Sequence, residues 1–124
     1  MAQLLIIDDD HLIRETLSDI FADSGHVVRV APDGEVALTL FEDSAADLVI
    51  VDILMPKKEG IETIRELRVK SPAVKIIAIS GRGRSAKADF LQMAKSLGAD
   101  QILPKPFTPK QILATADELL DPPR

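Results

Sequence analysis

Aspartates gather directly after two runs of aliphatic residues. Asp8–Asp10 follow Leu4–Ile7, and Asp52 follows Leu48–Val51. Carboxylates crowded in a partly desolvated cleft repel one another, so they take up a proton or bind a divalent cation. An all-oxygen donor set selects a hard ion, and a shallow site open to water favours Mg²⁺. A carboxylate beside such an ion can act as a nucleophile toward phosphorus, giving an aspartyl phosphate.

A hydroxyl and an ammonium group follow two further aliphatic runs. Ser80 comes directly after Val74–Ile79, and Lys105 stands shortly after Ile102–Leu103. A phosphoryl group in transfer needs a cation and a hydrogen-bond donor around it. Lys105 alone would be an ordinary surface lysine with a packed stem. Its place beside three acidic groups favours a functional role.

The runs that carry these residues alternate with segments of helical period, which is typical of βαβ units on a parallel sheet. The expected strands are Leu4–Ile7, Val27–Val30, Leu48–Val51, Val74–Ile79 and Ile102–Leu103. Pro104 and Pro106 follow the fifth strand and cannot donate ladder hydrogen bonds, so this strand belongs at an edge. We predict a three-layer (βα)5 α/β fold, a flavodoxin-like doubly wound sheet of order 2-1-3-4-5. Ligands bind such sheets beyond the carboxyl ends of strands one and three.

Residues that start and stop helices fall at the expected boundaries. Gly25 and Gly98 stand where helix C-termini need a positive φ. Asp10 is predicted to cap a helix that begins at His11 or the next residue, which leaves it outside the site. Thr108–Gln111 forms a capping-box start with proline at the first helical position.

Composition limits the function classes. The chain has 124 residues, enough for one domain, and no cysteine, which excludes thiolate chemistry and disulfides. Its aliphatic runs are too short to span a membrane, so we expect a soluble cytoplasmic protein without membrane insertion. Residues 1–62 carry 4 basic and 14 acidic side chains, whereas residues 63–124 carry 11 and 6. The acidic first half argues against direct binding of nucleic acid.

Together these residues resemble the receiver domain of bacterial two-component response regulators, from Gln3 to about Leu120. The matching segments are Leu-Ile-Ile-Asp8-Asp9-Asp10, Asp52-Ile-Leu-Met55-Pro56 with Gly60 downstream, Ile79-Ser80-Gly81, Gly98-Ala99-Asp100 and Lys105-Pro106-Phe107. Each segment alone is weak, but in this order, each at the end of the right strand, they are specific. We expect residues 1–124 to be a single receiver domain without an output domain; a fragment of a larger regulator or hybrid kinase is the alternative.

The resemblance implies a phosphoacceptor signalling domain that does not turn over an external substrate. Asp52 would accept a phosphoryl group from a phosphohistidine on a sensor histidine kinase or histidine phosphotransfer protein. Asp9, Asp52 and the main-chain carbonyl of Leu54 would ligate Mg²⁺, and Asp8 would hold it through water. The downstream target stays unidentified.

The same resemblance assigns Lys105 and Ser80 to the phosphoryl group. Lys105 would pair with Asp52 and then with the phosphoryl oxygens, while Ser80 would donate a hydrogen bond to one of them. The Lys105–Pro106 peptide is expected to be cis, which an X–Pro bond permits at about 0.5–1 kcal/mol.

The chain departs from the family pattern at several positions. Ile102 stands where receivers commonly have an aromatic switch residue, and the loop that begins at Gly81 is longer than usual. Leu54 and Arg82 occupy the variable positions that tune the attack of water on the acyl phosphate. A bulky apolar group and a long cation there lead us to expect slow phosphate loss.

Two other functions remain open from the sequence. Asp8 and Asp10 also fit the Asp-x-Asp of haloacid-dehalogenase-like phosphohydrolases, with Asp8 as nucleophile, although 124 residues leave little room for a cap domain. A pseudo-receiver that binds partners without phosphorylation is the second. Residues 81–86 formally fit G-x-G-x-x-A, but they follow the fourth strand, and the acidic cluster would repel a pyrophosphate.

Overall fold

The computed structural model describes residues 2–53, 59–80, 96 and 98–120. Five parallel strands form one sheet of order β2-β1-β3-β4-β5, which confirms the predicted topology. The strands are β1 (Gln3–Ile7), β2 (Val27–Ala31), β3 (Leu48–Asp52), β4 (Lys75–Ser80) and β5 (Gln101–Pro104). The proline-flanked strand β5 lies at the edge, as its sequence predicts.

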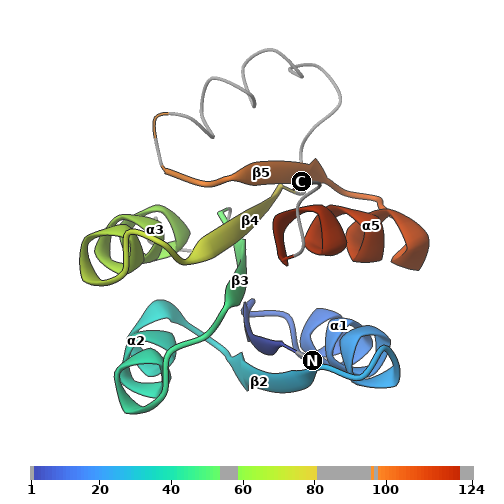
Figure 1. The fold of residues 1–124 in the computed structure, drawn as a ribbon, viewed down its shortest axis with the longest axis horizontal. Coiled ribbons are helices and arrows are strands. Elements are labelled where there is room, and N and C mark those ends of the chain that lie inside the picture. Colours follow the sequence, from blue (N-terminus) through green and yellow to red (C-terminus); the bar gives the residue numbers. More distant parts are fainter. Residues whose placement is uncertain (1, 54–58, 81–95, 97, 121–124) are drawn as a thin grey trace.

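Helices cover both faces of the sheet. They are α1 (His11–Asp23), α2 (Gly34–Asp43), α3 (Glu59–Lys70) and α5 (Pro109–Leu120). Helices α1 and α5 pack on one face, and α2 and α3 on the other (Figure 1). This arrangement confirms the three-layer, doubly wound prediction. The segment between β4 and β5, where the alternation of strands and helical segments predicts a helix, falls almost entirely outside the described residues.

Alternate residues of each central strand enter two separate cores. Leu4 and Ile6 of β1 join the cluster beneath α1 and α5, whereas Leu5 and Ile7 join the cluster beneath α2 and α3. All four are at most 1% exposed, and β3 is buried along its whole length. Every second side chain along a strand therefore points to the same face of the sheet.

The predicted helix ends are confirmed. The Asp10 side chain accepts hydrogen bonds from the amides of Leu12 and Ile13. Gly25 and Gly98 have φ of 91° and 90°. The capping box at α5 closes reciprocally, with a bond of 3.1 Å from the amide of Gln111 to the Thr108 hydroxyl and one of 2.7 Å in return.

Four strands end one residue later than predicted. Their last residues are Ala31 in β2, Asp52 in β3, Ser80 in β4 and Pro104 in β5. The ladder register continues through Asp52 opposite Ile79 and Ser80 opposite Pro104. Asp52 is thus anchored by the sheet itself.

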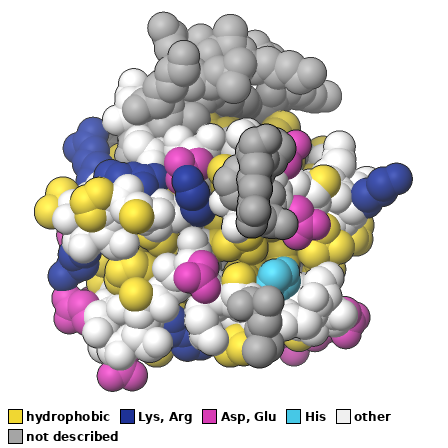
Figure 2. Space-filling view, viewed as in Figure 1, with side chains coloured by type: hydrophobic (Ala, Val, Ile, Leu, Met, Phe, Trp, Pro, Cys, Tyr) yellow, Lys and Arg dark blue, Asp and Glu magenta, His cyan; other side chains and the backbone are white. Residues whose placement is uncertain are grey.

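The charge asymmetry along the sequence does not produce a patch of one sign on the face in Figure 2. Acidic and basic side chains are interspersed over that face. Within the described part of the chain, no helix is long and apolar enough to cross a membrane.

Candidate functional site

The register of the two central strands brings Asp8 and Asp52 together. Ile7 of β1 pairs with Val51 of β3, so Asp8 and Asp52 are the next positions along neighbouring strands. Parallel strands lie about 4.8 Å apart. Asp8 and Asp52 come two residues after Ile6 and Ile50, whose side chains pack beneath α1 and α5, so they lie on the same face of the sheet. Asp8, Asp9 and Asp52 each offer a carboxylate oxygen, and these oxygens lie within 4.8 Å of one another.

Lys105 reaches this cluster from the segment between β5 and α5. Its Nζ lies 3.7 Å from Asp52 Oδ2 and 3.8 Å from Asp8 Oδ2, and the lysine side chain is 26% exposed. The Lys105–Pro106 peptide is cis, as expected. Among the described residues, the Lys105 ammonium group thus lies close to two of the three clustered carboxylates, those of Asp8 and Asp52.

Asp8 is buried and only partly compensated. It is 1% exposed. Its Oδ1 accepts a 2.9 Å hydrogen bond from the Asp10 amide, while its buried Oδ2 accepts none from the described residues. Burial raises the pKa of Asp8 from 3.8 to about 6; the Asp52 carboxylate adds to the rise, whereas the Asp10 amide and Lys105 oppose it. At neutral pH Asp8 therefore carries a charge that its surroundings disfavour.

The donor set fits a hard divalent cation. Three carboxylates converge, one oxygen among them lacks a hydrogen bond, and Asp9 is exposed to water on the outer side. Mg²⁺ prefers oxygen ligands and keeps several of its own waters, which suits a site that is half open. The main-chain carbonyl of Leu54, expected as a further ligand, lies outside the described residues.

Gly60 holds the end of β3 by close contact. A Cβ atom on Gly60 would lie 2.3 Å from the Asp52 carbonyl oxygen and 2.8 Å from the Ile53 Cα. The first turn of α3 therefore packs directly on the main chain of Asp52, and only glycine fits. Sequence reasoning named Gly60 as part of a motif without this reason.

The other predicted residues are placed only in part. Ser80 ends β4 beside the cluster, but its side chain, Gly81 and Arg82 lie outside the described part of the chain. Ile102 is half-buried and packs against the core beneath α2 and α3. Pro106 is exposed and lines a cavity of about 290 Å³ beside Lys105.

Sequence reasoning missed Arg14. This residue, in α1, donates a 2.8 Å hydrogen bond from Nη1 to the main-chain oxygen of Asp8. Helical side chains lean toward the helix N-terminus. A long cationic side chain four residues after the helix cap could thus have been predicted to reach back to the aspartates.

Comparison with known proteins agrees with this geometry. The model of the response regulator receiver domain family matches residues 4–117. Transcriptional regulatory protein CpxR of Klebsiella pneumoniae is 38% identical over 120 residues, which cover 97% of this chain and 50% of CpxR. Response regulator MprA of a Mycobacterium species is 33% identical over 118 residues, covering 95% and 50%. The chain spans about half the length of the curated relatives it matches.

Solved structures show the same fold. Chemotaxis protein CheY4 of Vibrio cholerae has a TM-score of 0.88 and 31% identity, covering 97% of this chain and 99% of that one. NtrX of Brucella abortus also has a TM-score of 0.88, with 30% identity over 97% of this chain and 27% of NtrX. The chain belongs to the response regulator receiver domain family of two-component signal transduction.

Proposed function

We propose that this chain is a phosphoacceptor in a two-component phosphorelay, with Asp52 as the residue that is phosphorylated. One observation carries the proposal. The Asp52 carboxylate stands at the end of a fully buried strand, 3.7 Å from Lys105 Nζ and within 4.8 Å of carboxylate oxygens of Asp8 and Asp9. The donor is a phosphohistidine on a sensor histidine kinase or histidine phosphotransfer protein.

The transfer exchanges one bond for another. An oxygen of Asp52 attacks phosphorus, the new O–P bond forms, and the N–P bond to the donor imidazole breaks with its electron pair left on nitrogen. Lys105 compensates the charge on the phosphoryl oxygens. The proposal assigns the Ser80 hydroxyl as a hydrogen-bond donor to one of those oxygens.

Mg²⁺ is part of the proposal, held by Asp9, Asp52 and the Leu54 carbonyl, with Asp8 acting through water. When bound, it neutralises the clustered carboxylates and polarises the phosphoryl oxygens. The buried Asp8 Oδ2 without a hydrogen bond supports a cation at this place.

Residues 1–124 act here as one receiver domain that is not a turnover enzyme. Phosphorylation favours a pre-existing conformer through new contacts from Lys105 and Ser80, and that conformer docks a target protein. Because Leu54 and Arg82 occupy the variable positions of the family pattern, we expect slow phosphate loss, and a half-life of seconds would refute this point. The cytoplasm, where ATP supplies the donor kinases, is the proposed location.

The test is intact-mass analysis after incubation with acetyl phosphate and Mg²⁺. The wild-type chain should gain the mass of one phosphoryl group, and Asp52→Asn should gain none. Asp47→Asn is the matched control, because Asp47 lies at the other end of the sheet and its Oδ2 accepts a bond from the Gln3 amide. Chelation of Mg²⁺ should suppress the gain.

Two outcomes would contradict the proposal. A mass gain that survives in Asp52→Asn and disappears in Asp8→Asn would indicate the haloacid-dehalogenase-like chemistry. That outcome is disfavoured because Asp10, the second aspartate of that motif, caps α1. Binding of Mg²⁺ without any mass gain would indicate a pseudo-receiver.

A further inference from the structure

We infer that Arg14 is a positioning residue for the cation site, because its guanidinium fixes the turn between β1 and α1 that carries Asp8 and Asp9. The inference rests on the proposed function, since it concerns the affinity of the same site for Mg²⁺.

Arg14 joins the end of β1 to the start of α1. Its Nη1 donates to the Asp8 carbonyl oxygen at 2.8 Å, and its own amide donates to the Asp10 carbonyl at 3.1 Å. The side chain is half-buried. It therefore spans the turn that holds two of the three clustered carboxylates.

The polar atoms of Asp8 are tied by three separate segments. Its amide donates to the Ala31 carbonyl of β2 at 3.2 Å, its carbonyl accepts from Arg14, and its Oδ1 accepts from the Asp10 amide. Within the described part of the chain Oδ2 accepts no hydrogen bond, and that oxygen lies 3.8 Å from Lys105 Nζ. The hydrogen bond from Arg14 connects the main chain of Asp8 to α1. Without it the Asp8 carbonyl loses this donor, and the turn between β1 and α1 is held less firmly to the helix.

Arg14 acts on geometry rather than on charge balance. Among the described residues it forms no ion pair, and its Nη2 lies 3.3 Å from His11 Nδ1. Substitution should thus change the placement of the carboxylates without removing a direct partner of any of them. Partners that orient metal ligands typically account for 10–100-fold in metal affinity.

The test is a Mg²⁺ titration of the full chain, followed by the backbone amide resonances of residues 8–10. The chain contains no Trp or Tyr, so intrinsic fluorescence of those side chains is not a usable readout. We expect Arg14→Gln to raise the Mg²⁺ dissociation constant about tenfold. Arg14→Lys keeps the charge and one donor, so it should restore part of the loss.

Arg29→Gln is the matched control. The Arg29 guanidinium also bonds main-chain oxygens, those of Leu40 at 2.8 Å and Ser44 at 2.5 Å, but it does so at the C-terminal end of α2. This variant should lower the free energy of unfolding while its Mg²⁺ affinity stays at the wild-type value. An equal loss of Mg²⁺ affinity in Arg29→Gln, no loss in a folded Arg14→Gln, or a loss in Arg14→Lys as large as in Arg14→Gln would overturn the inference.

Measurement of phosphoryl uptake distinguishes a failure of this inference from a failure of the proposed function. Arg14→Gln should need more Mg²⁺ for half-maximal uptake from acetyl phosphate and reach the wild-type rate at saturation. A wild-type chain that binds Mg²⁺ but takes up no phosphoryl group contradicts the proposed function, while the titration still decides the role of Arg14. A wild-type chain that binds no Mg²⁺ overturns both.

Discussion

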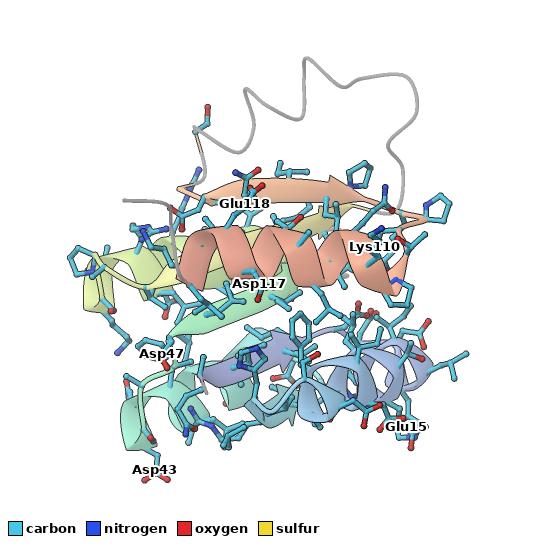
Figure 3. All side chains as sticks on the ribbon, turned by 45° about the vertical axis from the view of Figure 1, so that its right-hand side comes forward. Glu15, Asp43, Asp47, Lys110, Asp117 and Glu118 are labelled. Atoms are coloured by element: carbon cyan, nitrogen blue, oxygen red, sulfur yellow. The ribbon has the colours of Figure 1, made fainter. Side chains whose placement is uncertain are left out.

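Aspartates stand at both ends of the same sheet, and the two ends treat them differently. At the amino end, Asp47 Oδ2 accepts from the Gln3 amide at 2.8 Å, and Asp100 Oδ2 accepts from the Ile76 amide at 2.8 Å. Asp100 also pairs with Arg68 at 3.0 Å. Figure 3 shows Asp47 at the end of the sheet opposite Lys110, which lies in the first turn of α5. At the carboxyl end, three carboxylates lie close together, and among the described residues Lys105 pairs with two of them.

The contrast shows how one residue type serves two purposes. The amino-end carboxylates meet strand amides and a guanidinium, and so stabilise the starts of strands. The carboxyl-end cluster keeps like charges close together, and among the described residues its buried Asp8 Oδ2 accepts no hydrogen bond. Such an arrangement of like charges is unfavourable unless a proton or a cation neutralises it.

The largest effect is expected at the glycines of the two ends. Gly60→Ala at the carboxyl end would press a methyl group into the main chain of Asp52, so it should destabilise the fold by about 3 kcal/mol. Gly25→Ala at the amino end meets no atom within 4 Å and costs only the strain of a positive φ, about 1 kcal/mol. Chemical denaturation measures both. Equal losses would show that the close packing at Asp52 is absent in solution.

The next effect has the opposite sign. Asp8→Asn removes a buried charge, so it should raise the free energy of unfolding of the Mg²⁺-free chain by about 2 kcal/mol at pH 7, after the cost of burying the new amide. The same variant should lose most of the stabilisation that added Mg²⁺ gives the wild type. Thermal denaturation with and without Mg²⁺ tests both points; a variant less stable than the Mg²⁺-free wild type would refute the account of Asp8.

The gain in unfolding free energy of Asp8→Asn should depend on pH in a defined range. The pKa of Asp8 is raised from 3.8 to about 6 on folding, so the folded chain binds this proton more tightly than the unfolded chain. Below pH 3.8 Asp8 is protonated in both states, so its charge does not lower the free energy of unfolding. Between pH 3.8 and about 6 the destabilisation by this charge grows, and above that range it is constant. The advantage of Asp8→Asn over the wild type should shrink as the pH falls from 6 toward 4, where only the cost of burying the amide remains, and it should level off above pH 6. A difference that is constant from pH 4 to 7 would contradict this.

The smallest effect concerns the amino end. Asp100→Asn keeps one acceptor but loses its charge toward Arg68, which also donates to the carbonyls of Gly98, Pro72 and Val74. We expect a loss of about 1 kcal/mol in unfolding free energy. Uptake of phosphate should stay unchanged, and a change in it would show that the two ends are coupled.

Most of the fold could be predicted from the sequence because its determinants are local. Aliphatic runs of strand length, helical periodicity, the Asp10 cap and the glycines at 25 and 98 all fall where the structure has them. The prolines after the fifth run predicted its place at an edge, and the flavodoxin-like order 2-1-3-4-5 agrees with that place. The strand ends at Asp52 and Ser80 were one residue off because the ladder register, which no local pattern sets, carries them into the sheet.

The site could be predicted only as a set of residues. Their order along the chain indicates one edge of the sheet, but not that Asp8 keeps an oxygen without a donor or that its pKa rises. Those properties depend on burial by segments far away in sequence. The contact of Gly60 with Asp52 is also tertiary, so sequence reasoning gave no reason for that glycine, whereas the contact of Arg14 with Asp8 is local and could have been predicted from helix geometry.

The most direct test of the central claim is to trap the acyl phosphate and map it. Borohydride reduces an aspartyl phosphate to homoserine and leaves free aspartates unchanged, so peptide mass spectrometry after phosphorylation identifies the reacting residue. The account predicts homoserine at position 52 alone. Homoserine at position 8, or at neither position in a chain that has gained a phosphoryl group, would contradict it.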